Sequence, residues 1–180
     1  MNSITIEKIS LDDYTPFFTY LDNHLSENGN ENILFLPLSR DQLQLDSKWK
    51  KKFLDGFNKE FGQPGWRKLW VAKNHKQQIV GHIDIRSRNE LNTRHRVLLG
   101  MGVDSGSRKL RIGQNLLDFV IQYCKAHKYI DWLDLEVLTN NAPAISLYSK
   151  NNFIVLANLE DMFRIDNKSY DYTSMTLNVS

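Results

Sequence analysis

The sequence has little cysteine, no long apolar run and no leader-like start. Its single cysteine, Cys124, rules out an internal disulfide framework. Cys124 lies at helical spacing with Leu117, Val120 and Ile121, a pattern that predicts a buried core thiol. No apolar stretch reaches the length of a membrane span, and residues 1–7 lack a signal-peptide core. We therefore expect a cytoplasmic protein.

Several common kinds of functional site also find no support. The five histidines lack the spacing of a zinc site and no cysteine pair assists them, so we expect no metal. Neither a Gly-x-Ser-x-Gly nucleophile turn nor a Gly-x-x-x-x-Gly-Lys-Ser/Thr phosphate loop occurs, which argues against hydrolases and nucleotidases. The 23 basic and 21 acidic residues leave a net charge of +2, which gives no nucleic-acid signal.

The length and composition of the chain predict a single domain. A chain of 180 residues that is 41% hydrophobic can bury a substantial core, and no repeat or linker divides residues 1–180. Apolar alternation and turn residues predict strands at 4–9, 69–73, 79–86, 97–103, 132–138 and from 153. Helices are predicted from 12–13 and over 41–61, the second ended by the Gly and Pro residues of 62–65.

Two motifs stand out in the second half of the chain. The strand at 97–103 runs into a basic turn, residues 105–114, that opens a helix. Unpaired amides and the helix dipole at such a start suit a diphosphate, although a basic turn alone more often marks a solvated helix start. The second motif is Asn-x-x-Ala-x-x-Leu-Tyr over 141–148, between the strand at 132–138 and the strand that starts near Phe153. Strand, helix and strand in this order give both motifs a structural context.

This order resembles the acyl-CoA-binding core of the GNAT N-acetyltransferase superfamily, and the resemblance covers nearly the whole chain. It implies an α/β (α+β) fold with one mixed central sheet of about six to seven strands and about four flanking helices. It also implies acetyl-CoA as co-substrate and a primary amine, on a small molecule or a peptide, as acceptor. The sequence leaves a second possibility open: a GNAT-like domain that binds acyl-CoA or a protein partner without turnover.

The resemblance also implies where the coenzyme binds. The family pattern, Arg/Gln-x-x-Gly-x-Gly/Ala, matches at Arg108 and Gly113, but Arg111 stands where the first glycine is usual. The Arg111 side chain would either crowd the phosphates or bind them. The residues implied to contact the coenzyme are Met101, Val103, Arg108, Lys109, Arg111, Ile112, Gly113, Gln114 and Asn141. For Asn141, capping of the following helix is an equally adequate role.

Charged residues interrupt two of the predicted central strands. Asp84 on one strand and Asp134 and Glu136 on the other fall on a polar face, and between these strands Gly100 and Gly102 supply no side-chain bulk. Buried charges must be paired or solvated. The polar face is therefore either an acid-lined groove suited to a cationic amine or a set of structural ion pairs.

An acetyltransferase also needs groups that move protons. An amine must be neutral to attack a thioester, yet a lysine-like amine has a pKa of about 10.4 in water. Glu136 is our first candidate for the base that accepts its proton, and Asp84 is the second. By resemblance, Tyr148 protonates the departing sulfur. Residues 25–65, the region expected to select the acceptor, contain no pattern that identifies it, and oligomeric state is equally unreadable.

Overall fold

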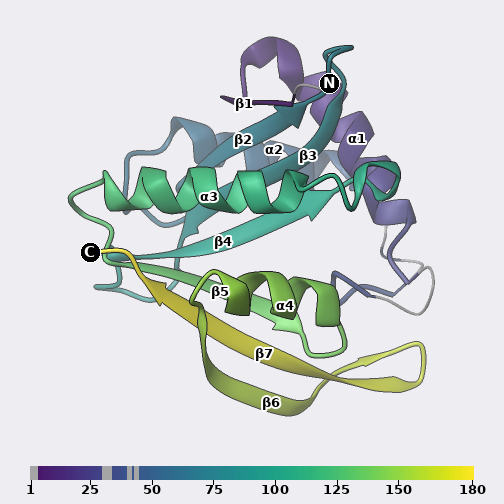
Figure 1. Cartoon of the computed structure of the whole chain (residues 1–180), viewed down its shortest axis with the longest axis vertical. Helices are drawn as coiled ribbons and strands as arrows, with labels where there is room; N and C mark the ends of the chain where they lie inside the picture. The colour runs from purple at the N-terminus through teal and green to yellow at the C-terminus, as the bar shows by residue number, and fades with distance from the viewer. Residues whose placement is uncertain (1–3, 30–33, 40–41, 43–44) are drawn as a thin grey trace.

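A seven-stranded sheet forms the centre of the computed structural model, which describes residues 4–29, 34–39, 42 and 45–180 (Figure 1). The strand order is β1-β2-β3-β4-β5-β7-β6, and among these neighbours β4 and β5 alone are parallel. The strands are β1 Thr5–Lys8, β2 Arg67–Lys73, β3 Ile79–Ser87, β4 Arg96–Val103, β5 Trp132–Leu138, β6 Ile154–Ile165 and β7 Lys168–Asn178.

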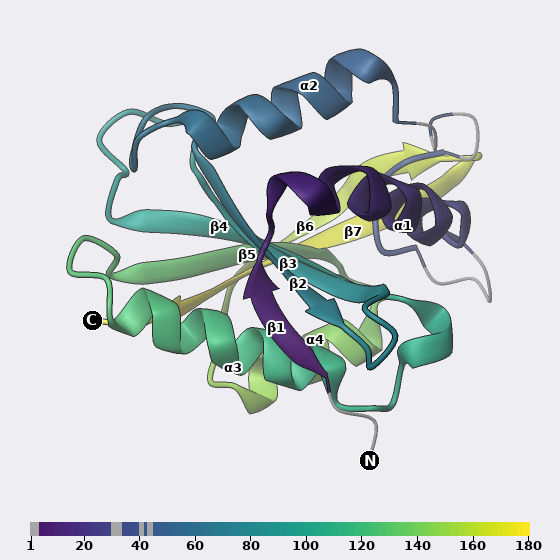
Figure 2. The ribbon, with the colours of Figure 1, turned by 90° about the horizontal axis from the view of Figure 1, so that it is seen from above.

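Helices cover both faces of this sheet. Helices α1 (Tyr14–Ser26) and α2 (Ser47–Asp55) lie on one face, while α3 (Ile112–Lys125) and α4 (Ala142–Lys150) lie on the other (Figure 2). The predicted fold, a mixed sheet between two layers of helices, is thus confirmed.

The helix predicted over 41–61 is shorter in the structure. The Asp46 carboxylate accepts a hydrogen bond of 2.6 Å from the Trp49 amide, which caps α2 at Ser47. The helix ends at Asp55, and a 3-10 turn over Gly56–Asn58 follows it. A Cβ at Gly56 would lie 2.7 Å from the Gly65 carbonyl oxygen, so the chain turns where the glycine permits close approach. Residues 41, 43 and 44 of the predicted helix lie outside the described residues.

Period-two alternation explains which side chains fill the core. On β3, Ile83 and Ile85 point toward the α3 layer and pack in one cluster with Leu133 and Leu135 of β5. Cys124 of α3 belongs to the same cluster and is fully buried, which confirms the predicted core thiol. Burial raises the pKa of this thiol to about 12.

The parallel pair β4–β5 separates along its length. Residues 96–98 pair with residues 132–134, and beyond Leu98 and Asp134 both strands continue without pairing to each other. Figure 1 shows β4 and β5 running apart toward their C-terminal ends. We call this region the β4–β5 divergence. Backbone groups that leave a ladder need other partners, so this opening in the sheet is a natural place for a ligand.

Candidate functional site

The backbone of the basic turn is shaped for an anion. Lys109 and Arg111 adopt left-handed conformations, with φ of 64° and 62°, and Leu110 between them does not. This alternation of backbone conformation points successive backbone N–H groups to the same side of the chain, as in anion-binding nests. Helix α3 starts directly afterwards at Ile112, so its first amides and its dipole add to the same positive end. The turn therefore has a backbone suited to an anion, and the diphosphate site stays a prediction.

The strand end, the basic turn and α4 meet at Gly113. A Cβ built on Gly113 would lie 3.5 Å from a Leu147 methyl carbon of α4, 3.7 Å from Val103 Cγ2 and 3.9 Å from Met101 Cε. The structure thus brings Met101 and Val103, two residues expected to contact the coenzyme, next to the turn expected to hold its phosphates.

Two of the expected coenzyme ligands use their side chains for structure. The Gln114 amide donates to Asn151 Oδ1 at 2.8 Å and accepts from Asn151 Nδ2 at 3.1 Å, which joins α3 to the end of α4. Asn141 caps α4, because its Oδ1 accepts a hydrogen bond of 3.3 Å from the Ala144 amide. Any coenzyme contact of Gln114 would therefore come first from its backbone amide.

A residue that the sequence did not single out connects this turn to the opposite face. Glu27, at the end of α1, accepts a hydrogen bond from the Ser105 hydroxyl and lies 3.8 Å from Arg108 Nη2. No local pattern identifies this contact, since Ser105 is 78 residues away in the sequence. Glu27 therefore links the helical layer of α1 to the basic turn.

Tyr148 lies in α4 beside Leu147, which touches the start of α3. Its side chain is 6% exposed, and its ring packs at 5.6 Å from that of Phe153. Burial raises the pKa of the Tyr148 phenol to about 12, so it keeps its proton at neutral pH. No described residue hydrogen-bonds this hydroxyl, yet it is not sealed from solvent. The phenol is thus a proton donor without an acceptor among the described residues.

On the other face of the sheet, Asp84 is held in ion pairs. Its Oδ2 lies 3.1 Å from Arg67 Nη1 and 3.3 Å from Arg86 Nη1, and its side chain is 5% exposed. Its Oδ1 occupies the space above Gly100, 2.6 Å from where a Cβ would be. A carboxylate removed from water needs such partners. For Asp84 the structure thus shows ion pairs in place of an acid-lined groove.

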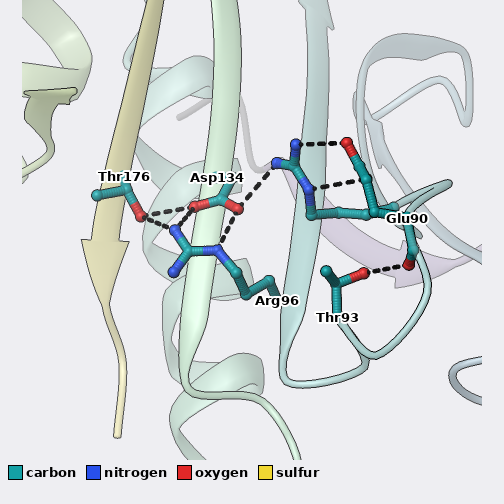
Figure 3. Close-up of polar contacts among 6 residues, drawn as sticks. Glu90, Thr93, Arg96, Asp134 and Thr176 are labelled. Carbon is teal, nitrogen blue, oxygen red and sulfur yellow. Dashed lines mark hydrogen bonds and ion pairs between the residues drawn. The ribbon is translucent and has the colours of Figure 1, made fainter. Parts of the chain in front are cut away.

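Asp134 is likewise paired, at the start of the β4–β5 divergence (Figure 3). Arg96 donates to its two oxygens at 2.6 and 2.9 Å, Arg88 donates at 3.1 Å and the Thr176 hydroxyl donates at 2.6 Å. Burial alone would raise the pKa of Asp134, but the hydrogen bonds from Arg96 and Thr176 outweigh it and the pKa is lowered. The network ties β4, β5 and β7 together where the strands begin to separate.

Glu136 differs from both aspartates. It is exposed, and it makes no ion pair with any described residue. Glu136 lies two residues beyond Asp134, as Gly100 lies two beyond Leu98, so the two face each other across the divergence. Of the two candidate bases, Glu136 is therefore the one without an ion-pair partner among the described residues.

Tyr172 of β7 shows which charges gather above this opening. Burial and, to a smaller extent, the negative charge of Glu136 raise the pKa of its phenol to about 12, and the positive charge of Arg86 opposes both. The charges of Arg86 on β3 and Glu136 on β5 therefore both lie near the Tyr172 phenol. The sequence predicted a shared polar face for β3 and β5, but it did not predict the contribution of β7, which depends on the strand order.

A cluster of neutral histidines lies toward the end of β4. The Tyr20 hydroxyl and His82 Nδ1 are 3.0 Å apart, and His24 stacks on Tyr20 and on Phe35. Burial lowers the pKa of His82 to about 3 and that of His24 to about 4, so both rings are neutral at pH 7. A Cβ at Gly102 would come within 2.7 Å of both rings, which explains the glycine at this position.

Open volume alone would not locate this site. Hollows of about 1010 Å³ and about 1000 Å³ lie elsewhere, at the β6–β7 tip and beside residues 87–95. We therefore assign the site from strand geometry, amide orientation and charge. No helix within the described ranges is long and apolar enough to cross a membrane.

The family is identified by comparison with known proteins. The sequence model described as Acetyltransferase (GNAT) family matches residues 36–153, more than half of the chain, and the chain belongs to this family. An *Escherichia coli* K12 relative, L-amino acid N-acetyltransferase AaaT, is 27% identical over 122 residues, which cover 68% of this chain and 67% of that protein.

Solved structures share the fold at low sequence identity. A GNAT-family acetyltransferase from *Streptococcus pneumoniae* superposes with a TM-score of 0.82 at 21% identity, covering 99% of this chain and 100% of that one. The spermidine N-acetyltransferase from *Vibrio cholerae*, solved with CoA and spermine, gives a TM-score of 0.74 at 12% identity and covers 97% of this chain and 95% of its own. At these identities the comparisons establish the fold and leave the acceptor open.

Proposed function

We propose that this protein transfers an acetyl group from acetyl-CoA to a primary amine by direct attack of the amine. One observation carries the proposal. The β4–β5 divergence has an amide-lined basic turn beside it on the α3 side and, on the α1 side, the carboxylate of Glu136, which has no ion pair among the described residues. Donor and acceptor would thus approach the same opening from opposite faces of the sheet.

The basic turn and the end of β4 would hold the coenzyme. Amides of 109–114 would face its diphosphate, and Arg108, Lys109 and Arg111 would supply positive charge. Backbone groups of Met101 and Val103 would hydrogen-bond the pantetheine arm, since β4 lacks a β5 partner there. When bound, acetyl-CoA supplies an acetyl group activated as a thioester.

Two side chains would move the protons. Glu136 would accept a proton from the ammonium form of the acceptor, directly or through a water, because an amine attacks only when neutral. Tyr148 would donate its phenolic proton to the departing sulfur. Asp84 remains the second candidate base, but its ion pairs with two arginines favour a structural role.

The acceptor would be an amine on a small molecule or a peptide. The name of the *Escherichia coli* relative points to amino acids, and that of the *Vibrio cholerae* structure points to spermidine. Neither likeness is close enough to choose between these acceptors.

Binding measurements test the coenzyme site. We expect the protein to bind CoA much more tightly than pantetheine, which lacks the phosphates, because the basic turn acts on the diphosphate. Titration calorimetry with both ligands gives the two affinities. Equal affinities would show that the turn does not recognise the phosphates, and absence of transfer from acetyl-CoA to a mixed amine panel would overturn the proposed reaction.

Arg111→Gly separates the two roles considered for this side chain. Removing a left-handed non-glycine residue should stabilise the fold by about 1 kcal/mol. Loss of a charge-assisted hydrogen bond should weaken CoA binding by about 10- to 150-fold. Thermal unfolding and calorimetry measure the two effects separately.

Lys109→Gly is the matched control, since Lys109 has the same left-handed backbone. We expect it to give a similar gain in stability with a smaller loss of affinity. Tighter CoA binding by Arg111→Gly would show that the guanidinium crowds the phosphates.

A further inference from the structure

The ion-pair cluster on β2 and β3 carries excess positive charge. Arg67 and Arg86 both approach the same oxygen of Asp84, at 3.1 and 3.3 Å. Two guanidinium groups therefore share one carboxylate, and one positive charge is left without a paired anion among the described residues. Arg67 also lies over the Phe53 ring, with its Cζ 4.0 Å from the ring centroid, so Arg86 is the guanidinium without a second partner among the described residues.

The neighbouring network around Asp134 is built differently. It also contains two arginines, Arg88 and Arg96, but Glu90 pairs with Arg88 and restores neutrality (Figure 3). The Asp84 cluster has no second carboxylate within ion-pair distance among the described residues, and the nearby charge of Glu136 lies across the divergence on β5. Arg86 could therefore pair with an anion that comes from outside the chain.

The surplus charge lies at the site itself. A Cβ built on Gly100 would lie 2.9 Å from Arg86 Nη1, so the guanidinium extends over this glycine of β4. The Arg86 side chain is 35% exposed, compared with 20% for Arg67, so Arg86 is the more accessible of the pair. Glu136 lies opposite Gly100 on the far side of the divergence. The charges of Arg86 and Glu136 both act on the pKa of Tyr172.

We propose that Arg86 binds a carboxylate on the acceptor and that the acceptor is amino-acid-like, with this carboxylate a few atoms from the reacting amine. The inference rests on the proposed function. A guanidinium binds a carboxylate with two parallel hydrogen bonds, and Arg86 spends a single donor on Asp84. The ammonium of the same molecule would then face Glu136 on the far side of the divergence. A polyamine would instead place a cation beside a guanidinium.

Matched acceptors test the charge requirement. We would measure kcat/KM for L-α-amino acids and for their carboxamides, which keep the amine and side chain but lose the anion, together with spermidine. The acids should be better substrates than their carboxamides by roughly 10- to 150-fold, mainly through KM. Equal or better use of carboxamides or spermidine would overturn the inference while leaving acetyl transfer intact.

Variants at Arg86 locate the effect. Arg86→Gln should remove the preference for acids over carboxamides, and Arg86→Lys should keep part of it because the charge remains without the planar pair of donors. Arg164→Gln removes the same charge from an exposed position on β6, where Arg164 is 80% exposed, and should change nothing. An unaltered preference in a folded Arg86→Gln or Arg86→Lys protein would contradict the assignment.

Product binding separates the two proposals. With CoA present, an N-acetyl amino acid should bind the wild-type protein more tightly than the corresponding N-acetyl carboxamide, as measured by calorimetry. A protein that shows this difference but acetylates no amine would overturn the proposed reaction and support the anion site. A protein that acetylates amines without this difference would support the proposed reaction and overturn the anion site.

Discussion

Replacing Tyr148 with phenylalanine is expected to lower acetyl transfer by roughly 10²- to 10⁴-fold while leaving CoA affinity nearly unchanged. The substitution keeps the ring, and with it the packing on Phe153 in the α3–α4 core. It removes the proton that burial holds on the phenol, whose pKa of about 12 keeps it protonated across the working range. Steady-state kinetics gives kcat, and calorimetry with CoA gives the affinity.

Tyr129→Phe serves as the control for this experiment. Tyr129 is 57% exposed and lies after α3, away from the β4–β5 divergence, so loss of its hydroxyl should leave turnover unchanged. Wild-type turnover in Tyr148→Phe would mean that Tyr148 only packs in the core. A parallel fall in CoA affinity would point instead to a binding role.

The strands could be predicted from the sequence because their signal is local. Alternation in residues 132–138 gave β5 with its observed bounds, and the predicted strand at 97–103 differs from β4 by one residue. The α4 motif was equally readable, because an asparagine cap with Pro143 in the first turn marks a helix start within a few residues. Such features need no knowledge of the rest of the chain.

The partners of the charged residues could not be predicted. Alternation placed Asp84 and Asp134 on the polar face, but Arg96 lies 38 residues from Asp134, and which groups meet depends on strand order and register. The same holds for the early end of α2, since the residue that meets Gly56 is the distant Gly65. Sequence pattern shows which face a side chain occupies, whereas its neighbours follow from tertiary pairing.

At position 111 the structure adds a backbone requirement to what the sequence motif shows. The sequence left open whether an arginine in place of a glycine crowds the phosphates or binds them. The structure adds that the position is left-handed, with φ of 62°, so the usual glycine also serves the backbone. The side chain is therefore kept at a conformational cost, which is consistent with a favourable contact to a phosphate.

Glu136→Gln is expected to give the second large effect, a loss of roughly 10²- to 10⁴-fold in transfer rate at neutral pH. Without this carboxylate, only acceptor molecules that are already neutral can react. Their fraction rises about tenfold per pH unit below the pKa of the amine. The deficit of the variant should therefore shrink as pH rises, whereas Tyr148→Phe should not recover in this way.

Asp84→Asn gives the comparison that distinguishes a base from a structural carboxylate. It leaves two guanidinium groups facing a neutral amide in a largely buried site, so it should destabilise the fold by about 3 to 5 kcal/mol. Exposed Glu136 makes no ion pair with the described residues, so Glu136→Gln should leave unfolding nearly unchanged. Rates over a range of pH, combined with denaturant unfolding of both variants, show which carboxylate is the base and which is structural. A pH-dependent rate defect in a stable Asp84→Asn protein, with a normal profile in Glu136→Gln, would move the base from β5 to β3.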